Sequence, residues 1–248
     1  MKKYILLAGM LYSISISSFG QGFNIGFHAG YGLGTARQVL LVNSTPNTFE
    51  SVKVSLGQGL NLGADLNLMF SENVGADLGF SYLIGSEFES SDVSNSTTRT
   101  STLKGNMLRI TPGIKVSAGE TKNVCPYGRF GLILGVAGKI KEVETISGQG
   151  NLSTNEYEYT EGTSIGWYGA FGLAFKLADN IRFTTELITY NQSYGPGQRE
   201  NTERSGGGNL DPIVTYVDEG NNATNNTAIR LYYPFSSVGL NAGILIGL

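Results

Sequence analysis

Apolar and small or polar residues alternate along much of the chain, and this period of two constrains the fold more than any other feature. In residues 22–34 every second position is apolar, and the positions between them are Gly, Asn or His. Such alternation is typical of a β-strand whose two faces have different surroundings. The pattern recurs, so the sequence predicts eight strands, at residues 22–34, 59–70, 76–85, 108–116, 127–136, 165–176, 181–190 and 238–248.

The connections between these segments alternate in length. Short turns are expected at residues 71–73, 118–123 and 178–180, and long polar loops at residues 35–55, 86–104, 139–163 and 191–227. A barrel that crosses a membrane an even number of times has short turns on one side and long loops on the other. A soluble sandwich does not require this rhythm. We therefore predict an all-β fold, an eight-stranded antiparallel up-and-down transmembrane β-barrel.

Composition excludes several other classes. Gly makes up 35 of the 248 residues, about twice the usual share, so a helical bundle or coiled coil is not expected. At 40% apolar residues the chain is too apolar for a disordered protein. No apolar run reaches the roughly 18 residues of a transmembrane helix. The net charge of −3 gives no support for nucleic-acid binding, and the single cysteine, Cys125, excludes an intrachain disulfide.

The N-terminus has the features of a secretory signal peptide. Two lysines precede an apolar segment at residues 4–16, and Ser18 and Gly20 then place small residues at the −3 and −1 positions of a cleavage site. We expect residues 1–20 to be the signal peptide and residues 21–248 to form one barrel domain with four long extracellular loops.

The volume of the apolar side chains decides which face of the strands points outward. A soluble carrier barrel would hold them inside, but large side chains from eight strands would overfill its narrow lumen. The opposite face is rich in small residues, so we predict that the apolar face contacts lipid and that both termini are periplasmic. Aromatic residues at the two ends of the lipid face form the expected girdles: Phe23, Phe70, Phe175 and Phe183 at one rim, and Tyr31, Tyr82 and Trp167 at the other.

Four segments carry a resemblance to a known family: residues 23–26, 126–132, 166–172 and 234–243. Together with the topology, they resemble the outer-membrane β-barrel domain family of Gram-negative bacteria, the small OmpX/OmpA/OmpW-like barrels. The resemblance implies an integral protein of the cell outer membrane that contacts outer-membrane lipid and lipopolysaccharide and is inserted by the outer-membrane assembly machinery. Such chains commonly end in an aromatic residue, whereas this one ends in Leu248.

Charged residues on the small-residue face are the main candidates for a functional site. They are Asp65, Asp77, Arg109, Arg129 and Glu186. Because unpaired charges in a narrow interior are costly, these acids and bases are expected to pair. The hypothesis is an ion-pair network that blocks the lumen; the alternative is structural filling with no gating role.

Three functions are compatible with such a barrel. The leading one is a non-enzymatic surface protein with a structural, adhesion or surface-interaction role. The second is passage of small hydrophobic molecules, for which Leu83 and Ile133 face the lumen. The third is a lipid A-modifying enzyme, for which His28 is the one histidine, expected far from both lipid and loops. No cofactor or metal is predicted.

The expected extracellular loops offer two further features. Five acids lie in residues 139–163, where a divalent cation or simple solvation would satisfy them. Ile213, Val214, Tyr216 and Val217 form a short apolar island in the last loop, which is expected either to extend a strand or to contact an extracellular partner.

Overall fold

The computed structural model describes residues 22–94, 96–118, 123–148, 151–205, 210–218 and 226–248, and in these ranges the ordered elements are β-strands. The expected signal peptide lies outside the described residues. Eight strands close into an antiparallel barrel, so the predicted fold class is confirmed. In order around the barrel they are β1 (Phe23–Gly34), β4 (Gly59–Met69), β5 (Val74–Ser94), β6 (Thr97–Ser117), β7 (Val124–Gly148), β9 (Thr163–Ala178), β10 (Ile181–Gly195) and β15 (Ser237–Gly247).

The barrel closes between its first and last strands. β1 pairs with β15 from Asn24 opposite Gly247 to Gly34 opposite Ser237, and on its other side it pairs with β4. The register keeps alternate side chains on one face, so Tyr31 lies beside both Leu240 and Leu60. Pairing of the first strand with the last closes the sheet into a barrel, as a spanning β-structure requires.

The side chains sort to the two faces of the barrel wall as the alternation predicts. Large apolar residues such as Phe130 and Leu240 are 63% and 67% exposed on the outside, whereas Asp77 and Arg109 are 3% and 0% exposed inside. The residues expected in the aromatic girdles lie on the outer face. Phe175 is half-buried because its ring lies 6.4 Å from that of Phe183. Within the described residues, no helix is long and apolar enough to cross a membrane.

The long connections differ from the expectation of polar loops, because most of their described residues form strands. β5, β6 and β7 are 21, 21 and 25 residues long, about twice what a membrane crossing needs. Seven further strands accompany them: β2 (Gln38–Thr45), β3 (Thr48–Val54), β8 (Asn151–Thr160), β11 (Gln198–Arg204), β12 (Val214–Val217), β13 (Thr227–Ile229) and β14 (Tyr233–Pro234). Thr and Ser are the commonest residues of these stretches, and the β-branched and aromatic residues among them favour strands.

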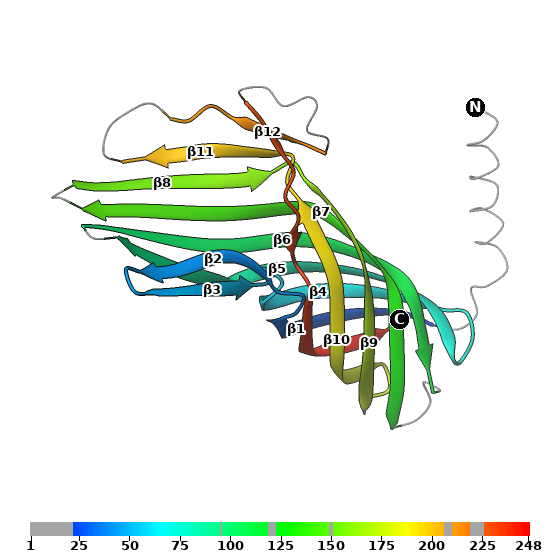
Figure 1. The fold of residues 1–248 in the computed structure, drawn as a ribbon. Helices are drawn as coiled ribbons and strands as arrows, with labels where there is room; N and C mark the ends of the chain where they lie inside the picture. The colour runs from blue at the N-terminus through cyan, green and yellow to red at the C-terminus, as the bar shows by residue number, and fades with distance from the viewer. Residues whose placement is uncertain (1–21, 95, 119–122, 149–150, 206–209, 219–225) are drawn as a thin grey trace, which may run out of the picture.

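We call this part beyond the barrel the extension, formed by β2, β3, β8, β11, β12, β13 and the distal parts of β5, β6 and β7. Figure 1 shows β2, β3, β8 and β11 running beside the long strands, away from the barrel end that carries the short turns. One face of the extension has its own apolar core, which continues into the barrel mouth and includes Leu41, Val54, Leu103, Ile140, Tyr159, Tyr216 and Tyr233.

Candidate functional site in the barrel lumen

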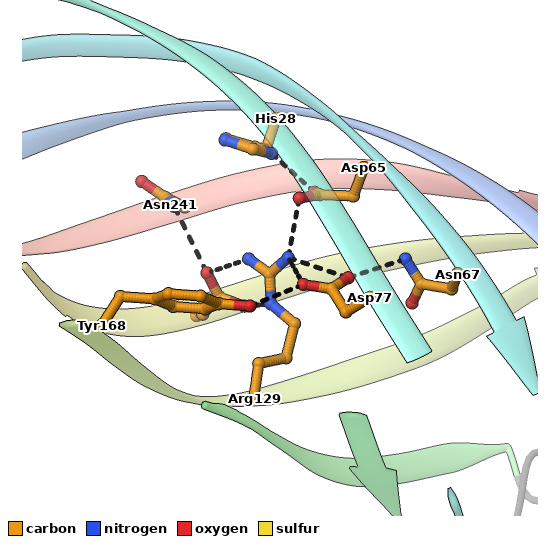
Figure 2. Close-up of polar contacts among 8 residues, drawn as sticks. His28, Asp65, Asn67, Asp77, Arg129, Tyr168 and Asn241 are labelled. Atoms are coloured by element: carbon orange, nitrogen blue, oxygen red, sulfur yellow. Dashed lines mark hydrogen bonds and ion pairs between the residues drawn. The ribbon is translucent and has the colours of Figure 1, made fainter. Parts of the chain in front are cut away.

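Arg129 is the centre of a buried cluster of charges in the lumen. Its guanidinium donates two hydrogen bonds to Glu186, at 2.9 and 2.8 Å, and it contacts Asp65 at 2.7 Å and Asp77 at 3.2 Å. These side chains come from four strands (β7, β10, β4 and β5). Figure 2 shows Asp65 and Asp77 pointing toward the Arg129 guanidinium. One arginine therefore crosslinks four strands of the barrel from inside.

Glycine makes room for this cluster at position 79. A Cβ added there would lie 2.3 Å from Thr111 Oγ1 and 2.9 Å from Asp65 Oδ1, whereas one added at Gly26 would be in ordinary contact with Asp65 Oδ2, at 3.5 Å. Both glycines sit directly opposite Asp65 on neighbouring strands. The absence of a side chain at Gly79 thus gives the Asp65 carboxylate space beside Thr111.

Neutral side chains complete the hydrogen bonding of the acids. Asn67 donates to Asp77 at 3.0 Å, and the Tyr168 hydroxyl donates to the other oxygen of Asp77 at 2.8 Å. Asn241 donates to Glu186 at 3.3 Å. These extra hydrogen bonds to the carboxylate oxygens help to offset the free-energy cost of removing the charges from water.

His28 and Lys115 are lumen residues that the proposed network did not include. His28 Nδ1 lies 2.8 Å from Asp65 Oδ2, and Lys115 Nζ lies 5.3 Å from the centre of the Tyr127 ring. These four residues, His28, Asp65, Lys115 and Tyr127, line a cavity of about 30 Å³ beside Arg129. Its volume is enough for about one water molecule. The alternation places Lys115 on the inner face, so this signal was present in the sequence.

Arg109, which was expected in the same network, lies outside it. Its guanidinium donates to Gln192 at 2.9 Å, to Asn61 at 3.0 Å and to the Phe235 carbonyl at 3.3 Å, and it lies 4.6 Å from the Tyr190 ring centre. Among its described contacts there is no carboxylate.

Distance along the strands explains this separation of the two arginines. Lys115 pairs with Arg129 across β6 and β7, and Arg109 is six residues further along β6, or about 20 Å at 3.3 Å per residue. Arg109 therefore forms a second layer of the lumen with neutral partners.

A chain segment lies across the lumen above Arg109, and no sequence pattern predicted it. Phe235 is fully buried, and its backbone N–H donates to the Gln192 carbonyl at 2.9 Å. The backbone N–H of Leu56 donates to the Pro234 carbonyl at 2.8 Å, and the Ser55 hydroxyl donates to the Ser236 carbonyl at 2.7 Å. We call residues 234–236 the mouth segment.

The two inward apolar residues, Leu83 and Ile133, are packed. Both are 0% exposed; Leu83 belongs to the apolar core that contains Phe235, and Ile133 packs in the cluster of Tyr168, Ile188 and Tyr190. The apolar upper lumen that the sequence suggested is therefore filled with side chains.

In the extension, four of the five acids and part of the apolar island have partners. Tyr159 donates to Glu142 at 2.5 Å, and burial together with this carboxylate raises the pKa of Tyr159 well above its ordinary value. Glu156 pairs with a lysine of β7, and in the described residues no three acids, histidines or cysteines are grouped to hold a metal ion. Tyr216 of the island lies in β12, and its ring stacks on that of Tyr159. Ile213 of the island is exposed.

The sequence matches the model of the outer membrane protein beta-barrel domain over residues 6–206. The chain belongs to this outer-membrane β-barrel family. It is therefore an integral outer-membrane protein, and the resemblance carried by the sequence motifs is confirmed. The match includes every barrel strand from β1 to β10, and β15 lies beyond it. No curated protein sequence matches the chain.

Solved structures of small outer-membrane barrels are similar to this member of the family. Neisserial surface protein A is 11% identical, with 90% of this chain and 96% of that chain covered and a TM-score of 0.41. OprG from Pseudomonas aeruginosa is 11% identical, with 94% and 99% covered and a TM-score of 0.49. Ail of Yersinia pestis, an attachment invasion locus protein, is 13% identical, with 92% and 97% covered and a TM-score of 0.35.

Proposed function

We propose that this protein is a closed, non-catalytic outer-membrane barrel that presents its extension at the cell surface as an interaction platform. In this proposal the short turns and both termini lie in the periplasm. The observation that carries it is the extension itself, in which strands as long as 25 residues continue past the barrel and acquire their own apolar core. Ordered backbone outside the membrane is suited to rigid presentation of side chains to a partner.

The hairpin ends of the extension supply candidate contact residues. Phe49, beside the β2–β3 turn, is 74% exposed, and Leu152, beside the β7–β8 turn, is 62% exposed. Exposed apolar side chains surrounded by polar residues are common at protein interaction sites. A structural, adhesion or docking role would use these ends of the hairpins.

The filled lumen supports a barrel that does not conduct. The Arg129 cluster, the Arg109 layer and the mouth segment succeed one another along the barrel, and each joins several strands by hydrogen bonds. Passage of hydrophobic molecules, the alternative function, would require the side chains around Leu83 and Phe235 to move apart. The lipid A-modifying reaction has less support, since the described contact of the His28 ring is with Asp65 in the lumen.

Three measurements test the proposal. An epitope inserted at Asn47, in the turn between β2 and β3, should be accessible to antibody on intact cells, and the purified barrel should give no open-channel conductance in planar bilayers. Removal of residues 41–51 should reduce attachment of cells to a coat of extracellular-matrix proteins. The Phe70→Ala variant, altered at the opposite rim, is the matched control. A protected epitope, a conducting wild-type barrel or unchanged attachment would contradict the proposal.

A further inference from the structure

The barrel wall has a gap in its hydrogen-bond ladder near the extension. β7 pairs with β9 up to Gly135 opposite Ser164, and it pairs with β8 from Ile140 opposite Tyr159 onward. Residues 137–139 of β7 still pair with β6 on their other side, but residues 136–139 and the joint between β8 and β9 do not pair with each other. The joint is bent, because Glu161 has a φ of 56°, in the left-handed region.

Tyr194 closes this gap from inside the barrel. Its hydroxyl donates to the Gly138 carbonyl at 2.8 Å and accepts from the Gly162 N–H at 3.2 Å. The ring is fully buried and packs against Phe235 at 5.8 Å. The gap is therefore sealed toward the lumen and open only toward the outside of the wall.

A groove of about 460 Å³ lies at the gap, lined by residues 136–139 and 160–162 together with Tyr82 and Asn106. Its volume is in the range of small-molecule binding sites. It is on the lipid-facing side of the wall, because Tyr82 is 44% and Val136 is 51% exposed there. Tyr82 was expected in the girdle nearest the extension, so the groove is at the boundary between acyl chains and headgroups.

The groove combines apolar surface with hydrogen-bond acceptors. Val136, Ala137 and Tyr82 offer apolar contacts, while the backbone of the gap and the Glu161 carboxylate offer polar atoms. The positive charge of Lys139 is already paired with Glu158 at 2.6 Å. A phosphate would meet Glu161, whereas a hydroxyl or amide N–H would donate to it, so the groove favours an uncharged donor group beside an apolar chain.

We propose that the groove binds one acyl chain of an outer-leaflet lipid that carries a hydroxyl or amide group next to the chain, as the hydroxyacyl chains of lipid A do. The proposed function supplies the outer-leaflet assignment. The chain lies along Val136 and Ala137, and its hydroxyl or amide donates to the open backbone or to Glu161. This lipid satisfies polar groups of the wall that would otherwise face hydrocarbon, where each unpaired group is costly.

Native mass spectrometry of the full barrel in detergent, titrated with lipid A, tests this inference. The wild type should retain one lipid A. Ala137→Trp fills the groove and should reduce the retained fraction at least tenfold. The matched control is Ala242→Trp, at an exposed position of β15 three strands away around the barrel, and it should bind like the wild type.

A replacement variant and a second lipid complete the test. If Ala137→Trp does not show the heat-dependent gel shift of a folded barrel, Glu161→Asn replaces it, because Asn tolerates left-handed backbone; it should lower retention severalfold. Equal retention by the wild type, the groove variant and the control would overturn the proposal, as would equal retention of phosphatidylethanolamine. The epitope experiment on intact cells tests orientation separately, so failure of the proposed function would be distinguishable from failure of lipid binding.

Discussion

Removal of the Arg129 side chain is the most informative perturbation of the lumen. In the native barrel four carboxylate oxygens lie between 2.7 and 3.2 Å from its guanidinium nitrogens. Arg129→Ala leaves Asp65, Asp77 and Glu186 buried with Lys115 as the remaining nearby cation. Breaking a buried pair by removing one partner costs about 3–5 kcal/mol, and here three acids lose the same partner. We therefore expect a loss of at least about 3 kcal/mol, or on the order of a hundredfold in the folding equilibrium.

Equilibrium unfolding in urea, with the barrel folded into lipid vesicles, measures this loss. The chain has one tryptophan, Trp167, which is exposed on the lipid face, so its fluorescence reports insertion and release. Arg37→Ala, which removes an exposed cation outside the barrel strands, is the control and should change stability by less than about 0.5 kcal/mol. If Arg129→Ala does not fold, Glu186→Gln provides a milder test, with an expected loss of about 1–3 kcal/mol.

The same variant tests whether the cluster blocks ion flow. With the guanidinium gone, water gains access to the three carboxylates, and we expect more cation conductance in planar bilayers than for the wild type. The Arg109 layer and the mouth segment stay in place and limit this conductance. A variant with wild-type stability and no conductance would refute the reasoning. It would mean that the charges fill the lumen without holding the strands together.

Three other predictions address separate parts of the structure. Arg109→Met removes hydrogen bonds to neutral groups only, so its stability loss in the same unfolding assay should be smaller than that of Arg129→Ala, about 1–3 kcal/mol. Gly79→Ala places a Cβ 2.3 Å from Thr111 Oγ1 and 2.9 Å from Asp65 Oδ1, and the crowding should cost about 1–3 kcal/mol, measured as a lower urea midpoint. Because the pKa of Tyr159 is raised above its ordinary value of 10.0, the neutral phenol stabilises the extension fully below about pH 10, and this contribution is lost as pH rises further. Protease digestion of the extension between pH 9 and 12 should show this loss, and Tyr159→Phe should make the digestion less dependent on pH.

The barrel could be predicted from the sequence because its signal is local and repeats. Each of the eight segments carries its own alternation, and burial of one face against lipid enforces it, so Phe130 and Leu240 point outward as expected. The pairing order follows from short turns between neighbours. The strands of the extension were not predicted because their exposed faces are polar. Sequences rich in Ser and Thr resemble loops when no lipid-facing surface imposes an alternation of apolar and polar residues.

The lumen site was only partly predictable. The inner face identifies which side chains enter the lumen, but height along the barrel depends on strand register, and register determines which charges meet. Arg109 was grouped with Arg129 for this reason, although pairing of β6 with β7 separates them by six residues. The mouth segment depends on contacts between residues 55–56 and 234–236, which are separated by 179 and 181 positions at the two Ser55 hydrogen bonds, and a single sequence has no local signal for such contacts.

The lumen layers would oppose the passage of ions by charge as well as by filling the space. In the lower layer three acids, Asp65, Asp77 and Glu186, face two bases, Arg129 and Lys115, so these five side chains have one more acid than base. In the upper layer Arg109 carries a positive charge among neutral partners. A cation that passed the mouth segment would first be opposed at Arg109, and an anion that passed Arg109 would then meet the acidic excess. In a low-dielectric lumen such charges act over several ångströms, so a permeating ion of either sign meets one layer of its own sign.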